Sequence, residues 1–172
     1  KGCGINHGGH ASSLTAPNAT AQANLIVNTY QKANINPLDV TYIEAHGTGT
    51  KLGDPVEIDG LKKAFRKLYE MNHITNFEEG YCNVGSVKSN IGHLESAAGI
   101  ASVFKVLLSM QKKRLPASIH INKLNPYLDL KDSPFRIIQE TKDWTVPEGK
   151  KRMAGISCFG YGGANANLVL EQ

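Results

Sequence analysis

Apolar and polar residues follow two kinds of pattern along this chain. Three segments have the features of helices, and short, largely apolar runs bounded by glycine, proline and asparagine separate them. The predicted helices span residues 18–33, about 54–69 and about 91–112. Residues 1–18 are predicted to begin as the end of a strand and to continue as a loop. The other predicted strands are residues 40–45, 81–87, 135–140, 152–159 and 165–171. Strands that alternate with helices predict an α/β domain.

The first two predicted helices begin with typical signals. Pro17 suits the first turn of one helix, because proline has no N–H that a helix start would need to satisfy. The other begins with Asp54 as an acidic cap, Pro55 at the first position and Glu57 at the third. The third predicted helix has small side chains in its first part and bulky ones later. The small side chains would let that part approach a neighbour or a catalytic centre closely.

Composition narrows the range of functions. The 172 residues are 41% hydrophobic and 20% charged, with a net charge of +4, which is ordinary for one globular domain. Two short basic runs, residues 112–114 and 150–152, are better explained as solvated surface than as a nucleic-acid site. A mildly basic surface can still meet an acidic protein partner. We therefore expect no nucleic-acid partner.

Cysteine content and hydropathy indicate the compartment. The three cysteines are widely spaced and form no CxxC, so neither a disulfide framework nor a zinc site is expected, and a reducing, cytoplasmic location fits. No window of 18 uninterrupted apolar residues predicts a membrane span. The chain opens on Lys1 rather than methionine, without a signal peptide, and has the character of a fragment.

The stretch HGTGT at residues 46–50 is the first candidate for chemistry. His46 ends a predicted strand, and the glycines beside it let a ligand approach the backbone. Thr48 and Thr50 add hydroxyl groups that can donate and accept hydrogen bonds. A lone histidine in such a place is more often a structural or a surface residue, so by itself His46 is a weak indication of function.

A second candidate lies in VGSVKSNIGHLESAAG. Lys88 and Asn90 fall in a loop after a strand, and His93 falls near the start of the predicted third helix. A helix N-terminus disfavours imidazolium, so His93 would stay neutral and could donate to a developing oxyanion. Glu95 could pair with Lys88. The plainer alternative is that Glu95 is a first-turn acid and Lys88 its surface partner.

The third candidate is ISCFGYGGANAN, where a strand delivers Phe159 into a glycine loop with Gly160, Gly162 and Gly163. Such a loop can swing an aromatic side chain, although an ordinary glycine turn between two strands explains it equally well. Cys158 is better read as a small buried residue than as a nucleophile. No P-loop, GxSxG, HExxH or GxGxxG motif is present.

Taken together, the three loops indicate a reaction. Two neutral imidazoles that converge on one carbonyl would stabilise an enolate or drive a decarboxylation. The missing part is a nucleophile to hold an acyl group, for which cysteine is best suited.

These three loops, in this order and at these separations, resemble the β-ketoacyl synthase (ketosynthase) family. The matching segments are EAHGTGTKLGDPVEIDGL, VGSVKSNIGHLESAAGIASVFKVLLSM, GISCFGYGGANANLVLE and the connector LPASIHINKLNPYLDL. The resemblance covers essentially the whole chain. The early HGG and the NPYLDL connector are most similar to ketosynthases of modular polyketide synthases, with a leaning towards the type that recruits its acyltransferase in trans.

The resemblance implies a thiolase-like fold, in which two α/β halves form a five-layer α-β-α-β-α sandwich. The family's nucleophilic cysteine lies in a TACSS-like motif of the first half, which is absent from these 172 residues. The whole chain, residues 1–172, is therefore expected to be the C-terminal portion of a ketosynthase, inactive by itself. The intact domain would be a homodimer with an N-terminal half and an acyl carrier protein as partners.

The resemblance also assigns roles to individual residues. His46 and His93 match the catalytic histidines, and Lys88 matches the lysine that orders the site electrostatically. Thr48 and Thr50 match positions that bind the phosphopantetheine arm, and Phe159 matches the gating aromatic of the glycine loop at residues 160–163. Asn90 and Glu95 would support the site. The resemblance implies no metal and no cofactor held by the domain itself, because the substrates arrive on the phosphopantetheine of a carrier protein.

Alternative functions remain open at this point. Many polyketide ketosynthases have NAH where this chain has Asn165-Ala166-Asn167. Fatty-acid relatives also lack that histidine. The chain could belong to a fatty-acid condensing enzyme, a thiolase or a decarboxylase-only ketosynthase. It could also be a non-catalytic binding or scaffold half. His46, which some non-elongating ketosynthases lose, favours part of a condensing enzyme that joins an acyl thioester to a malonyl extender.

Overall fold

The computed structural model of the chain describes residues 1–9 and 17–172. Its centre is a six-stranded sheet with the order β1-β8-β7-β2-β3-β5. Strands β7, β2, β3 and β5 run parallel, while β8 pairs antiparallel with both β7 and β1. The strands are β1 (Gly2–His7), β2 (Tyr42–Glu44), β3 (Cys82–Gly85), β5 (Phe135–Ile137), β7 (Met153–Phe159) and β8 (Ala164–Glu171).

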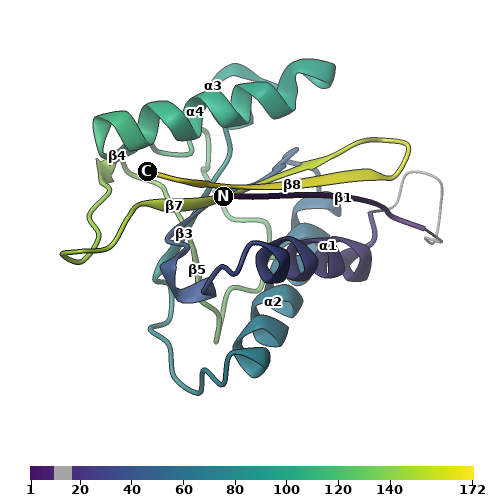
Figure 1. The fold of residues 1–172 in the computed structure, drawn as a ribbon. Coiled ribbons are helices and arrows are strands. Elements are labelled where there is room, and N and C mark those ends of the chain that lie inside the picture. Colours follow the sequence, from purple (N-terminus) through teal and green to yellow (C-terminus); the bar gives the residue numbers. More distant parts are fainter. Residues whose placement is uncertain (10–16) are drawn as a thin grey trace.

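Helices cover the sheet on both faces, so the chain forms three layers (Figure 1). Two long helices, α1 (Ala19–Lys32) and α2 (Gly53–Met71), lie on one face. The other face carries α3 (Lys88–Ile91) and α4 (Ala98–Lys112). Short pieces complete the chain: the 3₁₀ turns η1 (Pro37–Asp39) and η2 (Glu95–Ala97), and a two-stranded sheet of β4 (Arg114–Leu115) and β6 (Lys142–Asp143). The predicted α/β class is confirmed.

The central strands are buried on both faces because helices pack on each. Alternate residues of β2 point in opposite directions, so Ile43 joins the core under α1 and α2 while Tyr42 joins the core under α4. The two helices of the first face pack closely at Gly60. A Cβ there would lie 3.0 Å from Gln22 Oε1 and 3.2 Å from the Ala19 carbonyl oxygen, so a larger residue would push α1 and α2 apart.

Several predicted boundaries are wrong in ways that matter for the site. The helix predicted from Ile91 to Lys112 is broken: α3 ends at Ile91, and α4 begins only at Ala98. Gly92, at φ 77°, takes the left-handed conformation that turns the chain out of α3. Asp54 lies within α2 rather than capping it, and its Oδ1 accepts a hydrogen bond from the Gly49 N–H at 3.0 Å.

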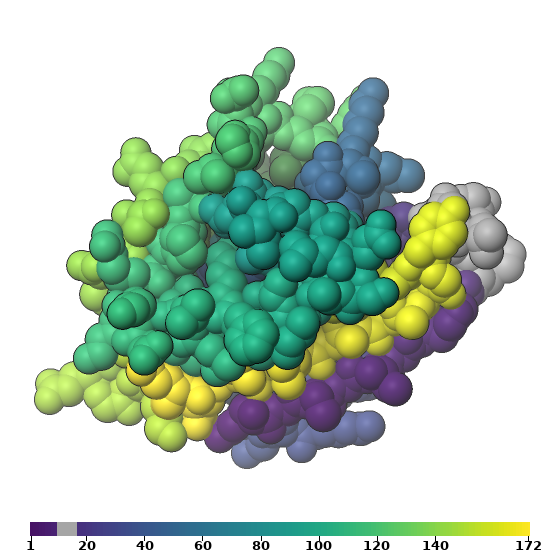
Figure 2. All heavy atoms as spheres, turned by 90° about the horizontal axis from the view of Figure 1, so that it is seen from above, coloured from purple at the N-terminus to yellow at the C-terminus, as the bar shows by residue number. Residues whose placement is uncertain are grey.

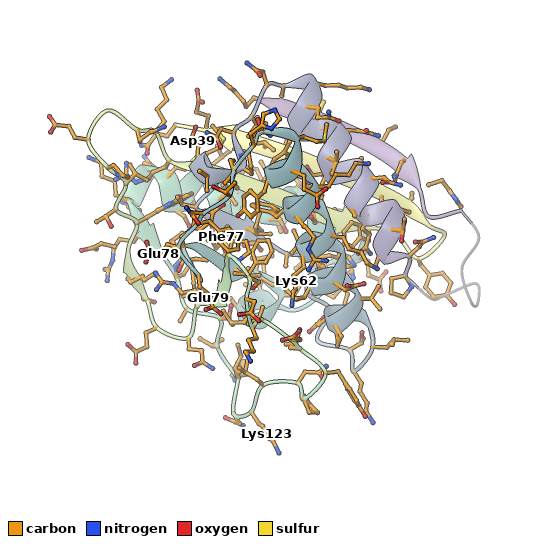
Figure 3. All side chains as sticks on the ribbon, turned by 90° about the horizontal axis from the view of Figure 1, so that it is seen from below. Asp39, Lys62, Phe77, Glu78, Glu79 and Lys123 are labelled. Atoms are coloured by element: carbon orange, nitrogen blue, oxygen red, sulfur yellow. The ribbon has the colours of Figure 1, made fainter. Side chains whose placement is uncertain are left out.

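Smaller differences concern the rest of the chain. The strands predicted at 81–87 and 135–140 are shorter, and the turn predicted after residue 142 begins with β6. The long connector of residues 116–134 lies along α2, where Lys62 (Figure 3) bonds Asp129 Oδ2 at 2.9 Å. Of the loop predicted within residues 1–18, positions 10–16 lie outside the described residues.

One face of α4 carries exposed apolar side chains. Figure 2, which views the molecule from the α4 side, shows this helix over part of the sheet, with β8 and β1 uncovered beside it. Phe104 is 59% exposed, and Ile100, Leu107 and Leu108 are each more than two-fifths exposed. Large apolar residues gathered in this way are uncommon on the free surface of a soluble domain and indicate a contact surface.

Candidate functional site

The three loops predicted to carry chemistry come together at one edge of the sheet. His46 follows β2, the segment that holds Lys88 and His93 follows β3, and Phe159 ends β7. These strands are parallel neighbours in the order β7-β2-β3, so their carboxyl ends open at the same edge. This is the usual place for a site in a parallel α/β sheet.

His46 lies at the centre of this group. Its ring centroid is 5.7 Å from that of His93 and 5.5 Å from that of Phe159. The backbone N–H of Phe159 donates a hydrogen bond to His46 Nδ1 at 3.3 Å. The strand end that carries the aromatic residue therefore also orients the imidazole.

His93 is held in a different way from that predicted. It lies in the loop between α3 and η2, not in the first turn of a long helix. The backbone N–H of Glu95 donates to His93 Nδ1 at 2.8 Å, and Glu95 adopts a positive φ of 48°. No ion pair joins Glu95 to Lys88 among the described residues, so the predicted pairing is wrong. Glu95 supports His93 through its backbone instead.

Both imidazoles are thus set in the same tautomer. A ring nitrogen that accepts a hydrogen bond carries no proton, so the hydrogen bonds place the proton of each neutral ring on Nε2. Two neutral rings, His46 and His93, can therefore each offer one N–H donor. That is the donor set that an enolate or oxyanion requires.

The electrostatic surroundings keep His46 neutral. The pKa of His46 is lowered from 6.5 to about 4, chiefly by burial, with Lys88 and His93 acting in the same direction. At neutral pH the ring therefore remains uncharged.

Lys88 is itself affected by the protein interior. Burial lowers the pKa of the Lys88 ammonium, while the Cys158 thiol and the carboxylates of Glu57, Glu44 and Asp54 act in the opposite direction. Two neighbouring cavities lie at this edge of the sheet, and Thr48 and Glu57 line both. Lys88 lines one of them, a cavity of about 390 Å³. His46 and His93 line the other, and Lys88 is absent from its described lining.

Glu57 is a site residue that sequence reasoning recognised only as part of a helix start. Its buried carboxylate accepts the backbone N–H of His46 at 2.8 Å and that of Gly47 at 2.9 Å. Burial raises the pKa of Glu57 to about 7, and these two hydrogen bonds oppose the rise. Gly47 has φ 49°, and a Cβ there would lie 2.6 Å from Ser86 Cβ, so the tight turn requires glycine. Glu57 thus sets the backbone of the HGTGT loop.

Glu44 is a second residue that the sequence analysis missed. It is completely buried in β2, where Tyr42 donates its hydroxyl to Glu44 Oε2 at 2.6 Å. Lys105 reaches the same oxygen from α4 at 2.9 Å, and the Val87 N–H donates to Oε1. The signal was an acidic residue within an otherwise apolar strand, two positions before His46. Glu44 connects β2, α4 and the segment that leads to Lys88.

The histidine pair lines a cavity of about 590 Å³. Thr48, Thr50, Phe159, Gly160 and Gly163 line the same cavity. The two threonine hydroxyls lie 3.4 Å apart, so both can face one ligand.

Four predicted site residues are absent from the described lining of this cavity: Lys88, Asn90, Glu95 and Gly162. Among the described lining residues, Gly162 is absent, and its carbonyl bonds His7 instead. Asn90 is likewise absent, and its amide bonds the Ala117 carbonyl at 3.4 Å. Asn90 therefore ties α3 to the connector rather than reaching the histidines.

The chain offers no obvious nucleophile or metal site within its described part. Burial raises the pKa of the Cys82 thiol well above its usual range, which disfavours the reactive thiolate. Cys3 is exposed on the edge strand, and Cys158 is partly buried beside Gly99. In residues 1–9 and 17–172, no three histidine, cysteine or acidic side chains gather as metal ligands. No helix in the same ranges is long and apolar enough to cross a bilayer.

Comparison with known proteins identifies this arrangement. Residues 1–122 match the family described as β-ketoacyl synthase, C-terminal domain. The chain belongs to this ketosynthase family. The family and the thiolase-like fold expected from the sequence are confirmed.

Relatives of this ketosynthase chain are modular polyketide synthases. It is 53% identical to polyketide synthase PksN and 47% identical to PksL, both of Bacillus subtilis strain 168. Each match covers 100% of the chain, which spans 3% of PksN and 4% of PksL. The chain therefore spans only a small part of the length of each of these relatives.

Solved ketosynthase structures share the fold. The ketosynthase from module 6 of the bacillaene synthase of Bacillus subtilis 168 matches 99% of the chain at 40% identity and a TM-score of 0.91. The oxazolomycin ketosynthase domain OzmH KS7 of Streptomyces albus JA3453 matches 99% at 45% identity and a TM-score of 0.89. The chain covers 29% of each of these structures.

Proposed function

We propose that this chain is the C-terminal half of a polyketide ketosynthase domain and supplies the two histidines of a decarboxylative Claisen condensation. The observation that carries the proposal is the geometry of His46 and His93. Their centroids lie 5.7 Å apart, and both use Nδ1 as an acceptor, so each has an Nε2–H left for substrate. Two such donors suit a reaction in which negative charge develops on one thioester oxygen.

The proposed reaction has two bond-making stages. A cysteine in the N-terminal half first attacks an incoming acyl thioester, so that a new thioester forms on the cysteine and the donor thiol leaves. A malonyl unit on a carrier protein then loses CO₂ as the bond between its α-carbon and carboxylate breaks, and the electron pair forms an enolate. His46 and His93 donate to that enolate oxygen. The enolate carbon attacks the acyl thioester, a carbon–carbon bond forms, and the cysteine leaves as thiolate.

The other site residues have supporting roles in this proposal. Thr48 and Thr50 would bind the phosphopantetheine arm, since both line the cavity of the histidines. Phe159 would gate access, since its ring lies 5.5 Å from that of His46. Lys88 would act through its charge on His46, because it lines the adjoining cavity. Glu57 would hold the loop that carries His46.

The proposed partners follow from the surfaces of the chain. The exposed apolar face of α4 would pack against the N-terminal half, which would complete the five-layer sandwich. The acyl carrier protein would bring substrate to the cavity mouth. The intact domain would work as a homodimer in the cytoplasm, and this chain alone would be inactive.

Intact-protein mass spectrometry tests the proposal. The intact ketosynthase domain and its His46→Gln variant are incubated with an acyl thioester and then with a malonyl carrier protein. Both should gain the acyl adduct, but condensation should fall at least about a hundredfold in the variant, the usual cost of losing one oxyanion donor. His73→Gln, in the exposed turn after α2, is the matched control and should behave as wild type.

Two results would contradict the proposal. Loss of acyl loading in His46→Gln would mean that His46 serves the nucleophile rather than the enolate. An acyl adduct on the 172-residue chain by itself, at Cys158 or Cys82, would mean that the nucleophile lies within this chain.

A further inference from the structure

The glycine loop at residues 160–163 is held at both of its ends. At one end, the Phe159 N–H bonds His46 Nδ1 at 3.3 Å. At the other end, His7 Nε2 lies 2.9 Å from the Gly162 carbonyl oxygen, and the Gly8 N–H donates to the Gly163 carbonyl at 2.7 Å. The proposed reaction uses the first contact and leaves the second without a role.

The ring of His7 can only act as a donor towards the loop. The Gly9 N–H donates to His7 Nδ1 at 3.0 Å, so that nitrogen is an acceptor and the proton lies on Nε2. Nε2–H therefore donates to the Gly162 carbonyl. Gly9 has φ 64°, the left-handed conformation that favours glycine and lets its N–H turn back to the ring two residues earlier.

The base of this contact is anchored to the body of the domain. Asn18, the N-cap of α1, donates from Nδ2 to the Gly8 carbonyl at 2.8 Å. The loop side is shaped to receive the ring, since a Cβ on Gly163 would lie 3.0 Å from His7 Cε1 and Nε2. The contact therefore requires glycine at two positions, at Gly9 because of its φ and at Gly163 because of the His7 ring.

We infer that His7 is a positioning residue that latches the 160–163 loop over the cavity of the histidines. Gly8 and Gly163, which the latch joins, line that cavity together with His46, His93 and Phe159. With the latch closed, Phe159 keeps its N–H on His46 and its ring beside the imidazole. With the latch open, the loop can move away from the cavity as one segment between its two ends. The functional meaning of the latch rests on the proposed function, whereas its existence does not.

Hydrogen–deuterium exchange of the intact ketosynthase domain tests the latch. Three substitutions separate its hydrogen bonds. His7→Phe keeps a ring and removes both bonds, His7→Asn keeps an acceptor for the Gly9 N–H, and His7→Gln keeps a donor for the Gly162 carbonyl. Ile5→Ala is the control, because Ile5 lies on the same face of β1 and is 86% exposed.

We expect the backbone amides of residues 160–165 to exchange about two- to tenfold faster in His7→Phe and His7→Asn, the factor that one neutral hydrogen bond provides. His7→Gln should return towards wild type, and Ile5→Ala should not differ from it. Exchange in α1 should be unchanged in all four variants. If the loop of His7→Phe exchanges at the wild-type rate, the latch is overturned. It is also overturned if exchange accelerates equally in α1, since that indicates general destabilisation.

Condensation measured on the same preparations separates this inference from the proposed function. If the wild-type domain fails to condense substrates, the proposed function is wrong, and the exchange comparison still decides whether His7 holds the loop. If the wild type condenses and the loop of His7→Phe exchanges as in wild type, the latch is wrong and the proposed function stands.

Discussion

The buried pair of Glu44 and Lys105 supports a quantitative prediction about stability. Glu44 is 0% exposed and the Lys105 side chain is 8% exposed, so water cannot solvate either charge. Lys105 lies 2.9 Å from Glu44 Oε2 and 5.7 Å from the centroid of the Tyr42 ring. The pair connects α4 to β2 in the middle of the sheet.

Lys105→Met removes the positive charge and keeps most of the side-chain volume. Glu44 would then retain the Tyr42 hydroxyl and the Val87 N–H as donors but lose its only ion-pair partner among the described residues. Removing one member of a buried pair costs about 3–5 kcal/mol. That is a large fraction of the roughly 5–15 kcal/mol that stabilises an ordinary domain.

Urea unfolding of the intact domain, followed by circular dichroism, measures this cost. The double variant Glu44→Gln/Lys105→Met should recover most of the loss, because a neutral amide in place of the carboxylate leaves no uncompensated charge. Lys62→Met is the control, since the Asp129 side chain of that ion pair is 75% exposed, and it should cost no more than about 1 kcal/mol.

Two results would refute the reasoning. A cost below about 1 kcal/mol for Lys105→Met would mean that the charge of Glu44 is not isolated from water. A double variant as unstable as the single variant would mean that the loss comes from packing of the lysine chain rather than from its charge.

Two further predictions concern the site. The His46 ring should titrate near pH 4, because burial, Lys88 and His93 lower its pKa. The free energy of unfolding should therefore decrease as pH falls from about 6.5 towards 4, since only the unfolded chain binds the proton in that range. NMR titration of the ring measures this pKa, and a value at or above 6.5 would contradict the environment described. Phe159→Ala removes the ring that lies 5.5 Å from His46 and should change the rate of acyl transfer or the range of acyl lengths accepted by the intact domain; kinetics unchanged across a series of acyl thioesters would rule out gating.

The amino-acid sequence by itself determined the class of fold and the position of the chemistry. Short apolar runs and helical spacing depend on neighbours within a few residues, so strands at Tyr42–Glu44 and Met153–Phe159 and the helix Ala19–Lys32 were predictable from local pattern. His46 and Phe159 were placed at strand ends for the same reason. The motifs that resemble ketosynthases predicted the family, which the comparisons confirmed.

The tertiary structure alone decided how these residues are held. The Phe159 N–H and the His46 ring are 113 positions apart in the chain, and they meet only because β7 and β2 are neighbours in the sheet. Glu57 matched an ordinary helix start, and its bonds to the HGTGT backbone depend on where α2 lies against β2. The break between α3 and α4 and the contact of His7 with Gly162 likewise depend on packing between distant segments. Local pattern specifies which element forms, whereas strand order and helix packing specify which side chains meet.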